Sequence, residues 1–465
     1  MKITGSRQCR LWVLTVIWSI FSASAHENDP KLLDRQPRYE GPGYRSDVAG
    51  RRGEPAFPSS GITLMAWLPL PEFGEVYRAS DCWGYTSDSG REYAILGFME
   101  GTAFVEITQP GNPQIVAVLE GFVSAWRDIK TYRHFAYAST EGGGGVQVFD
   151  LAQIDAGIVT LATTITEGGT LETHNVAIDE DSGFLYRCGG YNVTGLRIYS
   201  LADPANPEFV ARWDDKYVHD AQIVTYTEGP YAGRQIAFAC AGFNGGYVNP
   251  GLSIIDVTDK SDLRVLTHYE FPDPVYSHQG WLSEDKRLFY LNDELDERDL
   301  NIPTTTHVID VSDLANPVQV STFGSGSSAI DHNLYVRNGH IFEANYRSGL
   351  RVFNNEADAR NPVEVAFFDT YPEDDQAKSN GLWSVYPFFP SGTIIGSDIE
   401  RGLFVWRLTR CGSSYDVNED CFVDLKDFGL VAAQWNHYCQ GCAQDTDHNG
   451  RVTVQDMVSL LNNIP

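Results

Sequence analysis

Positive charge is scarce in this 465-residue chain: 34 Lys and Arg residues stand against 62 Asp and Glu, a formal net charge of −28 at pH 7. Because such a chain would repel a phosphate backbone, the composition argues against a nucleic-acid-binding protein. The chain also lacks the G-x-S-x-G, H-E-x-x-H and P-loop motifs of common hydrolases, zinc proteases and nucleotide-binding enzymes. Beyond residue 25, no apolar run approaches the roughly 20 residues that cross a bilayer. The sequence therefore names no reaction and predicts no transmembrane span.

Residues 1–25 have the three parts of a bacterial secretory signal peptide. A basic start through Arg10 precedes the apolar run LWVLTVIWSIF (11–21), and the small residues ASA (23–25) offer a cleavage site. An uncleaved N-terminal anchor is the alternative, but the apolar run is short for a membrane span. We expect an exported protein, either secreted or held at the cell surface. The next segment, residues 26–61, is polar and rich in Pro, Gly and Arg, which predicts a flexible leader.

One type of segment then recurs seven times, at a spacing of about 50 residues that is typical of propeller blades. Its apolar residues alternate, as in a half-buried strand, and most copies end in an Asp-Pro or Asn-Pro turn. The copies are GTAFVEITQPGNP (101–113), GVQVFDL (145–151), GLRIYSLADPANP (195–207), GLSIIDVTDKSDL (251–263), THVIDVSDLANP (306–317), GLRVFNNEADARNP (349–362) and GLFVWRL (402–408). Two strand-like runs precede each copy and one follows most of them, which gives four strands per unit.

The last unit ends at Leu408 without a fourth strand, whereas the run ITLMAWLPL (62–70) has no unit of its own. We expect this run to complete the last blade and close the ring, because closure removes an exposed sheet edge. The sequence thus predicts an all-β, seven-bladed β-propeller over residues 62–410, with a sandwich or a solenoid as the alternative.

At the level of whole segments, the repeats resemble LVIVD repeats, and residues 62–408 resemble the choice-of-anchor B family of exported bacterial proteins. The segments that carry the resemblance are DCWGYTSDSGREYAILGF (81–98), SAWRDIKTY (124–132), YSHQGWLSEDKRLFYLNDELDE (276–297), AIDHNLYVRNGHIFEANYRSGLRVF (329–353) and GLWSVYPFFPSGTIIGSDIERGLFVW (381–406). The resemblance implies a secreted or surface protein with an interchangeable C-terminal anchoring module, and it implies no catalytic activity.

Residues 411–465 contain two twelve-residue loops with oxygen-bearing side chains at positions 1, 3, 5, 9 and 12, as Ca²⁺ coordination requires. Position 7 lends a backbone carbonyl. The first loop offers Asp416, Asn418, Asp420, Phe422, Asp424 and Asp427, and the second offers Asp445, Asp447, Asn449, Arg451, Thr453 and Asp456. An apolar-periodic helix follows each loop. We predict two structural Ca²⁺ ions, the alternative being two acidic turns without a metal.

A loop followed by one helix, duplicated, resembles the EF-hand-like dockerin type I module, which implies a cohesin-like or cell-surface partner. Cys421 replaces the usual Gly at position 6 of the first loop, and the pairs Leu425-Lys426 and Val454-Gln455 are not the familiar Ser/Thr partner-selecting pair. These departures bear on the binding of a cohesin-like partner more than on the binding of calcium.

Four of the eight cysteines fall in the same region: Cys411, Cys421, Cys439 and Cys442. In an exported protein they predict two disulfides, of which three connectivities exist, with a zinc site as the alternative. The scattered residues Cys82, Cys188 and Cys240 are expected to be small buried apolar side chains.

The first strand of each blade should line the central channel, and aligning the units places polar and aromatic residues at its start. The channel candidates are Trp126, Asp128, His174, His219, Asp220, His278, Asp331, His332 and Trp383. Four converging imidazoles could hold a transition metal. Alternatively, these side chains hydrogen-bond the loops of neighbouring blades, or Trp126 and Trp383 stack against a glycan or peptide. The acidic segment LNDELDERD (291–299) is interpreted as a solvated face, with a cation site as the alternative.

Together these patterns predict a secreted or cell-surface binding or scaffold propeller with an unknown ligand, tethered by a calcium-binding dockerin-like tail. A metal-dependent enzyme built on the four channel histidines and a glycan- or peptide-binding propeller are the alternatives. The fold alone does not decide between them.

Overall fold

The structure is a computed structural model that describes residues 30–47, 56–169, 171–191, 194–409, 415–417, 423, 425–438, 442, 444–447 and 449–464. The predicted signal peptide, residues 1–25, lies outside this part of the chain. Among the described residues, no helix is long and apolar enough to cross a membrane.

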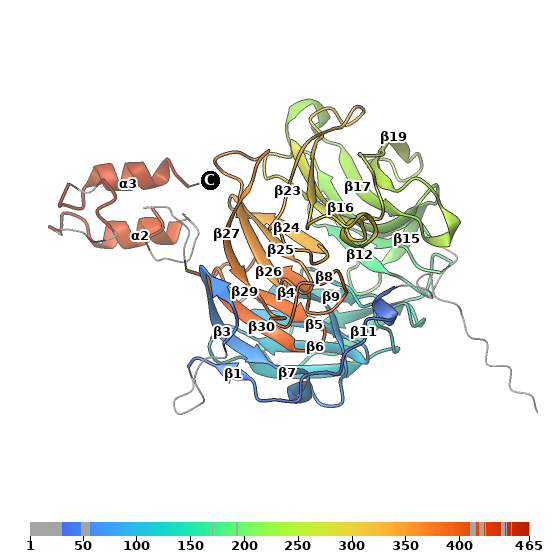
Figure 1. The fold of residues 1–465 in the computed structure, drawn as a ribbon, viewed down its shortest axis with the longest axis horizontal. Coiled ribbons are helices and arrows are strands. Elements are labelled where there is room, and N and C mark those ends of the chain that lie inside the picture. The colour runs from blue at the N-terminus through green and yellow to red at the C-terminus, as the bar shows by residue number, and fades with distance from the viewer. Residues whose placement is uncertain are drawn as a thin grey trace, which may run out of the picture.

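In the described residues the strands form seven antiparallel sheets, which are the blades of a β-propeller (Figure 1). Blade 1 consists of β4 (Ala79–Thr86), β5 (Glu92–Phe98), β6 (Gly101–Glu106) and β7 (Gln114–Glu120). Blade 2 consists of β8 (Ile129–Tyr132), β9 (Phe135–Ala138), β10 (Val146–Asp150) and β11 (Thr160–Ile165). Blade 3 consists of β12 (Asn175–Asp179), β13 (Phe184–Cys188), β14 (Leu196–Ser200) and β15 (Glu208–Trp213). Blade 4 consists of β16 (Tyr217–Thr225), β17 (Gln235–Gly242), β18 (Gly251–Asp256) and β19 (Arg264–Tyr269).

The remaining blades have the same order, and two of them gain strands from the N-terminal part of the chain. Blade 5 consists of β20 (Ser277–Leu282), β21 (Leu288–Asp293), β22 (Thr306–Asp310) and β23 (Val318–Phe323). Blade 6 consists of β24 (Asn333–Arg337), β25 (His340–Ala344), β26 (Leu350–Asn354) and β27 (Val363–Phe368), with β2 (Ser59–Ser60) at its edge. Blade 7 consists of β28 (Leu382–Tyr386), β29 (Ile394–Asp398), β30 (Gly402–Leu408), β3 (Ile62–Leu68) and β1 (Tyr44–Arg45).

The seven sequence repeats all become the third strand of a blade, from β6 in blade 1 to β30 in blade 7. Their Asp/Asn-Pro pieces are turns, as predicted. In three of these turns the backbone N–H of Asn206, Asn316 or Asn361 donates to the carbonyl of the Asp three residues earlier, and the Asn side chain donates to the carboxylate of that Asp. The predicted seven-bladed architecture is confirmed.

Ring closure also follows the prediction. The run 62–70 supplies β3, which pairs antiparallel with β30 of the last blade from Ile62↔Leu408 to Leu68↔Leu403. Trp67 stacks on Phe404 with ring centroids 5.4 Å apart, and its indole N–H donates to the carbonyl of Arg401. The first part of the propeller chain is therefore joined to the last by both backbone pairing and aromatic packing.

The hydrophobic core lies between neighbouring blades rather than at one centre. Between blades 1 and 2, Phe104 packs edge-on against Phe149 with centroids 5.4 Å apart, in a cluster that also holds Ile95 and Ile129. The scattered cysteines Cys82, Cys188 and Cys240 belong to these inter-blade cores and are buried free thiols, as predicted. Outer strands such as β23 alternate between exposed and half-buried residues, because successive side chains point to opposite faces of the sheet.

The described parts of the N-terminal segment do not form the flexible leader predicted from their polar composition. Residues 30–47 run over the propeller. The side chain of Lys31 in η1 (Pro30–Leu32) is buried, and β1 pairs with β3. The backbone N–H of Tyr39 donates to the carbonyl of Glu400, and β2 pairs with β27. Composition missed this packing because polar residues can satisfy the backbone of another segment as well as contact water.

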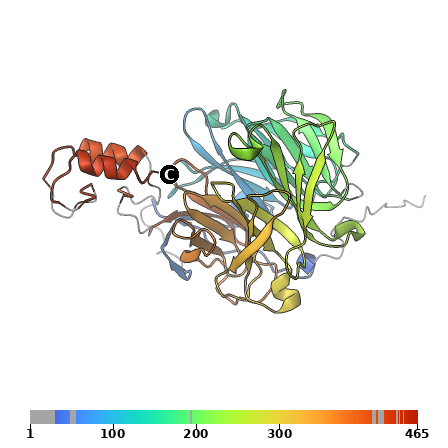
Figure 2. The same ribbon diagram turned by 90° about the horizontal axis from the view of Figure 1, so that it is seen from above.

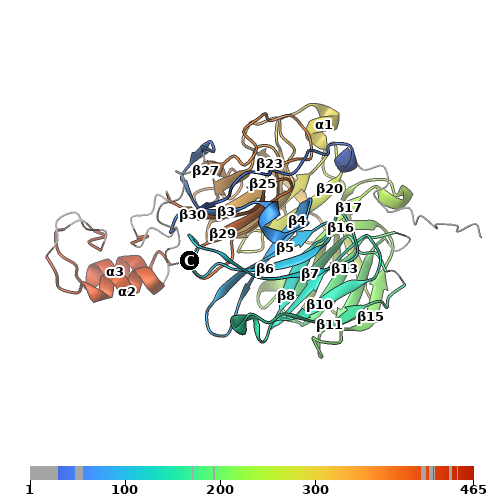
Figure 3. The same cartoon turned by 90° about the horizontal axis from the view of Figure 1, so that it is seen from below.

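Three α-helices occur in the described residues: α1 (Asp296–Leu300) in blade 5, and α2 (Leu425–Ala433) and α3 (Val454–Leu461) in the C-terminal region. Figure 1 shows α2 and α3 side by side, and Figures 2 and 3 show the same two-helix unit next to the propeller. Its small core contains Val417, Val431, Val452, Met457 and Leu460. Short 3₁₀ turns complete the fold: η2 (Leu70–Phe73), η3 (Ile154–Ala156), η4 (Gly229–Tyr231) and η5 (Asn244–Gly246).

Candidate functional site: the central channel

The innermost strands of the seven blades contact one another in order around a central channel. The predicted channel residues lie at or near the starts of these strands and are buried: Trp126, Asp128, His174, His219, Asp220, His278, Asp331, His332 and Trp383. The channel has a histidine layer toward one end, a layer of carboxylates with one lysine, and a cavity lined by aromatic rings.

Four histidines from blades 3 to 6 lie in series, as the alignment predicted. Ring centroids are 4.2 Å apart for His174 and His219, 4.0 Å for His219 and His278, and 4.2 Å for His278 and His332. All four side chains are buried. The sequence therefore located this layer correctly, although the chemistry depends on which nitrogen atoms are already bonded.

Most imidazole nitrogens of this layer have hydrogen-bond partners in the protein. The Nδ1 of His219 lies 3.1 Å from the carbonyl of His278, so it donates, and the Nε2 of His219 must accept from the Nε2 of His174 at 2.6 Å. The Nδ1 of His174 lies 2.8 Å from Glu141. The Nδ1 of His332 donates to the carbonyl of Trp383 at 2.6 Å. These bonds agree with the interpretation that the histidines join neighbouring blades.

A lysine from the N-terminal segment supplies a cation in the same layer. The Nζ of Lys31 lies 2.8 Å from a carboxylate oxygen of Glu294 and 3.5 Å from the Nε2 of His332. Lys31 and Glu294 are both buried. Burial and the nearby positive charge of Lys31 lower the pKa of His332 well below its usual value. The pKa of His278 is also lowered well below its usual value, by burial and by the neighbouring His332 and Lys31. Both imidazoles are therefore neutral at pH 7.

Trp126 and Trp383 are not open stacking platforms, contrary to the prediction for the glycan-binding alternative. Each exposes only 6% of its surface, within a cluster that includes Tyr346 and Ile330. The ammonium of Lys31 lies 4.7 Å from the ring centroid of Trp383. The N-terminal segment thus covers this end of the channel, which the sequence did not indicate.

The next layer holds acidic side chains around Lys130. Its Nζ lies 2.5 Å from Asp128 and 3.8 Å from Asp81, and it lies over the Trp83 ring at 4.4 Å. Burial alone would lower the pKa of Lys130, but the acids raise it above its usual value, so the amine stays charged. Burial raises the pKa of Asp220 to about 7, against the opposing effect of Lys130.

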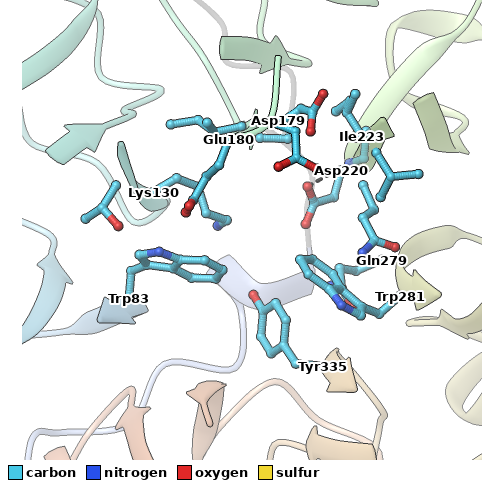
Figure 4. A pocket seen from close by; sticks show the side chains of 16 residues that line it. Trp83, Lys130, Asp179, Glu180, Asp220, Ile223, Gln279, Trp281 and Tyr335 are labelled. Carbon is cyan, nitrogen blue, oxygen red and sulfur yellow. Dashed lines mark hydrogen bonds between the residues drawn. The ribbon is translucent and has the colours of Figure 1, made fainter. Parts of the chain in front are cut away.

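Beyond this layer the channel opens into a cavity of about 250 Å³. Figure 4 shows the rings of Trp83 and Trp281 on either side of it, with the Tyr335 hydroxyl pointing inward between them and Lys130 and Asp220 across the cavity. Both tryptophans contact the Tyr335 ring edge-on, with centroids 5.6 and 5.1 Å away. We call this space, lined by the rings of Trp83, Trp281 and Tyr335, the aromatic cavity.

Four residues of the channel were not among those predicted from the sequence: Lys31, Lys130, Trp281 and Tyr335. Two of them carried a usable signal, since Trp281 follows His278 by three residues and Tyr335 follows His332 by three. The same alignment that found the histidines would have found the aromatic cavity one layer further along each strand. Lys31 carried no such signal, because it lies outside the repeats.

The predicted calcium loops are described in part. In the second loop the carboxylates of Asp445, Asp447 and Asp456 converge, with ligand oxygens all within 4.8 Å of one another. Thr453 caps α3 and forms a capping box with Asp456. Backbone N–H groups of the loop donate to these side chains. The N–H of Gly450 donates to Asp445, that of Arg451 to Asn449 and that of Thr453 to Asp456. The backbone N–H of Asn449 donates to Asp445 and Asp447. The site therefore offers the hard oxygen donors that Ca²⁺ prefers.

In the first loop, Asp416 and Asp427 are buried, and Asp427 accepts a hydrogen bond from the backbone N–H of Val417 at 2.8 Å. The remaining predicted ligands, Asn418, Asp420, Phe422 and Asp424, lie outside the described residues. Cys442 is disulfide-bonded. Cys411, Cys421 and Cys439 lie outside the described residues, so the connectivity stays a prediction.

No protein-family model matches this chain, and no curated protein is similar to it. A solved structure described as a functionally unknown protein from Desulfotomaculum acetoxidans DSM 771 is similar at 16% sequence identity and a TM-score of 0.47. The match covers 65% of this chain and 87% of that chain. The propeller fold stands on the strand pairing of the chain itself.

Proposed function

We propose that this protein is an exported binding propeller that holds one sugar residue of a glycan in the aromatic cavity. The observation that supports this function is the pair Trp83 and Trp281, which flank a cavity that also exposes polar groups. Indole rings bind the apolar face of a sugar ring, while buried polar groups orient its hydroxyls. At about 250 Å³ the cavity is smaller than the ~300–1,000 Å³ of sites for drug-sized ligands, which favours a single sugar ring.

The charges around the cavity favour an uncharged or basic sugar. The cavity is lined by the exposed acids Glu180 and Asp181 and by the buried acids Asp179 and Asp220. These carboxylates would repel an anionic sugar, whereas they accept hydrogen bonds from hydroxyl or amino groups. Lys130 is paired with Asp128 and contributes a donor without leaving an unbalanced positive charge.

A glycan array, followed by titration of any bound sugar, tests this proposal. Because Trp281 supplies one of the two flanking rings, Trp281→Ala should weaken binding by about tenfold or more. Trp281→Phe should keep part of the affinity, and Trp435→Ala, which removes an exposed ring in the C-terminal region, is the matched control. The proposal is wrong if no glycan binds, or if Trp281→Ala binds as tightly as the wild type.

We also propose that the C-terminal region is a dockerin-like tail that binds two Ca²⁺ ions and tethers the propeller to a cohesin-like or cell-surface protein. The converging carboxylates of Asp445, Asp447 and Asp456 support the calcium site. The repeats on the third strands support membership of the choice-of-anchor B family. Export would follow from cleavage after residue 25, and N-terminal sequencing of protein recovered from the culture medium tests that step.

The metal-dependent alternative rests on the histidine layer. Ligand atoms of His219, His278 and Glu294 lie within 4.8 Å of one another, so these three could hold a transition metal. Lys31 lies against the same carboxylate, and a metal would compete with its ammonium. This alternative therefore requires that Lys31→Met increase metal binding and that His278→Ala abolish it. If the Lys31→Met protein binds no Zn²⁺ when Zn²⁺ is supplied, this alternative is wrong.

A further inference from the structure

A second set of ligand-type side chains lies in the propeller wall between blades 5 and 6, outside the aromatic cavity. It combines the end of β21, the helix α1, the strand β22 and the residue two positions before β24. We call this set the wall site, and its residues are Asp293, Asp296, Glu297, His307 and Asp331. The acidic composition of segment 291–299 predicts a solvated face, but Asp293, Asp296 and Glu297 each expose 3% or less of their surface.

The wall site has the geometry of a metal-binding pocket. Ligand atoms of Asp293, Asp296 and His307 all lie within 4.8 Å of one another. The Nε2 of His307 is 3.7 Å from a carboxylate oxygen of Asp296, too far for a hydrogen bond. In the described part of the chain, no hydrogen bond joins Asp293, Asp296 and His307 to one another, and the spacing of their ligand atoms fits a single shared ion.

Several polar atoms of this pocket lack partners, although both carboxylate oxygens of Asp293 accept hydrogen bonds from the backbone N–H groups of Val275 and Tyr276. Both carboxylate oxygens of Asp331 are without a hydrogen bond although its side chain is fully buried. One oxygen of Asp296, one of Glu297 and the Nε2 of His307 are also unpartnered. In the described part of the chain, no Lys or Arg forms an ion pair with any wall-site carboxylate. Buried charges without partners are costly, and a bound cation is a usual way to balance them.

A neighbouring residue sets the orientation of the His307 ring. Its Nδ1 lies 3.0 Å from the Oε1 of Gln319, so Nδ1 donates to this carbonyl oxygen. In the neutral ring, Nε2 then carries a lone pair, and this lone pair faces the carboxylate of Asp296. Two lone pairs facing each other repel. Metal-bound histidines are typically oriented by a hydrogen bond of this kind from the other ring nitrogen.

Asp331 is fully buried, and the charges of Glu297, Asp296, Glu343 and Asp293 act on its carboxylate. An ion between them would reverse the sign of this electrostatic effect. The side chain of Asp331 is thus held in the wall by the fold at a free-energy cost that a cation would offset.

We propose that the wall site binds one divalent transition-metal ion, Mn²⁺ or Zn²⁺. Several carboxylates together with one imidazole suit these ions, whereas Ca²⁺ prefers oxygen ligands alone and softer metals prefer sulfur. The metal would hold together blade 5, α1 and the approach to blade 6. Glu294 lies between Asp293 and Asp296 in the chain, so the metal would also fix the segment that presents Glu294 to Lys31 in the channel. This inference is independent of the proposed sugar binding.

The test uses the full mature protein, stripped of metals and then dialysed against Mn²⁺ with excess Ca²⁺ to saturate the C-terminal loops. We expect one Mn²⁺ per chain, and electron paramagnetic resonance with electron spin-echo detection should show coupling to an imidazole nitrogen. Asp331→Asn should weaken Mn²⁺ binding at least tenfold. His307→Gln should abolish the nitrogen coupling, and Zn²⁺ should displace Mn²⁺.

Two controls make the assignment specific. Asp299→Asn changes an exposed acid of the same helix and should leave Mn²⁺ binding unchanged. His278→Ala removes a channel histidine and should also leave it unchanged. If Asp331→Asn fails to fold, the proposal is tested by the nitrogen coupling of the wild type and by its loss in His307→Gln. The proposal is overturned if no Mn²⁺ is retained, if excess Ca²⁺ displaces it, or if His278→Ala rather than the wall-site variants removes it.

Discussion

Lys31 supplies the positive charge that balances Glu294 in the histidine layer of the channel. The two side chains expose only 4% and 3% of their surface, and their charged atoms are 2.8 Å apart. In so buried an environment, removing one partner costs more than the pair itself contributes, because the other charge is left unbalanced.

We therefore expect Lys31→Met to lower the free energy of unfolding by about 3 kcal/mol, measured by urea denaturation. The double variant Lys31→Met with Glu294→Gln should recover part of this loss, since it removes both charges. Arg264→Met, which removes an exposed arginine paired with Asp262, should leave the unfolding curve unchanged. A fully stable Lys31→Met protein would mean that another group balances Glu294.

Glu343 gives a second residue-scale expectation, on pH dependence. Burial raises the pKa of Glu343 to about 7, while hydrogen bonds from Asn345 and Thr306 act in the opposite direction. An unfolded Glu titrates near 4.3, so the folded state binds the proton more tightly. The stabilisation by this group is complete below about pH 4 and disappears as the pH rises through about 7.

Glu343→Gln removes this titration and can keep both hydrogen bonds, because the Thr306 hydroxyl can accept as well as donate. We expect the variant to be more stable than the wild type at pH 8, by about 3–4 kcal/mol, and the difference to shrink toward pH 5. Denaturation of metal-free protein at several pH values measures it. A difference that does not change with pH would show that Glu343 does not titrate in this range.

At the scale of elements, the ring depends on one strand. β3 fills the outer place in blade 7 that the seventh repeat leaves open, and Trp67 anchors it on Phe404. Without this strand, β30 would present an unpaired edge, which favours aggregation.

We expect Trp67→Ala to cost about 3–5 kcal/mol of stability, as large aromatic truncations in a packed core do. Because the strand closes the ring, the variant should also aggregate more readily on heating, which light scattering measures. Trp435→Ala, at a 56% exposed position, is the control and should change neither quantity. A Trp67→Ala protein that melts like the wild type would show that the ring closes mainly through other contacts.

The sequence contained most of the propeller, because each blade repeats the same alternation and the same turn. It placed the third strands, the closing strand and the four channel histidines, since these depend on local pattern and on alignment between units. It did not place Lys31, whose contact with Glu294 is long-range and has no counterpart in other blades.

Segment 291–299 shows why the wall site was also misjudged. A run of acids is normally solvated, and nothing local indicates that Asp296 of α1 converges with His307 of β22 or that Glu297 is buried. Burial of charge is decided by tertiary packing, which a single sequence does not reveal. The aromatic cavity lies between these cases, because Trp281 and Tyr335 each follow a channel histidine by three residues, whereas Trp83 follows none.

At the scale of the whole molecule, the chain combines a large propeller with a small C-terminal region. The C-terminal core has only a few apolar side chains, and domains of this size usually need metals or disulfides for stability. The disulfide at Cys442 and the converging acids of the second loop fit that need.

We expect calorimetry of the metal-free protein to show an early transition for the tail and a later one for the propeller. Adding Ca²⁺ at about 100 times its dissociation constant should stabilise the tail by about 2.7 kcal/mol per site and leave the propeller transition in place. Asp456→Asn should weaken this response, because Asp456 is one of the converging ligands. A single transition that Ca²⁺ does not move would contradict the separate calcium-dependent tail.

The central claim is that the propeller binds a sugar in the aromatic cavity, and an experimental structure of the full chain with a bound sugar tests it most directly. We expect density for one sugar ring between Trp83 and Trp281, with a hydroxyl close to Tyr335 and Asp220. Sugar bound only elsewhere on the molecule, with the aromatic cavity left to water, would contradict the claim.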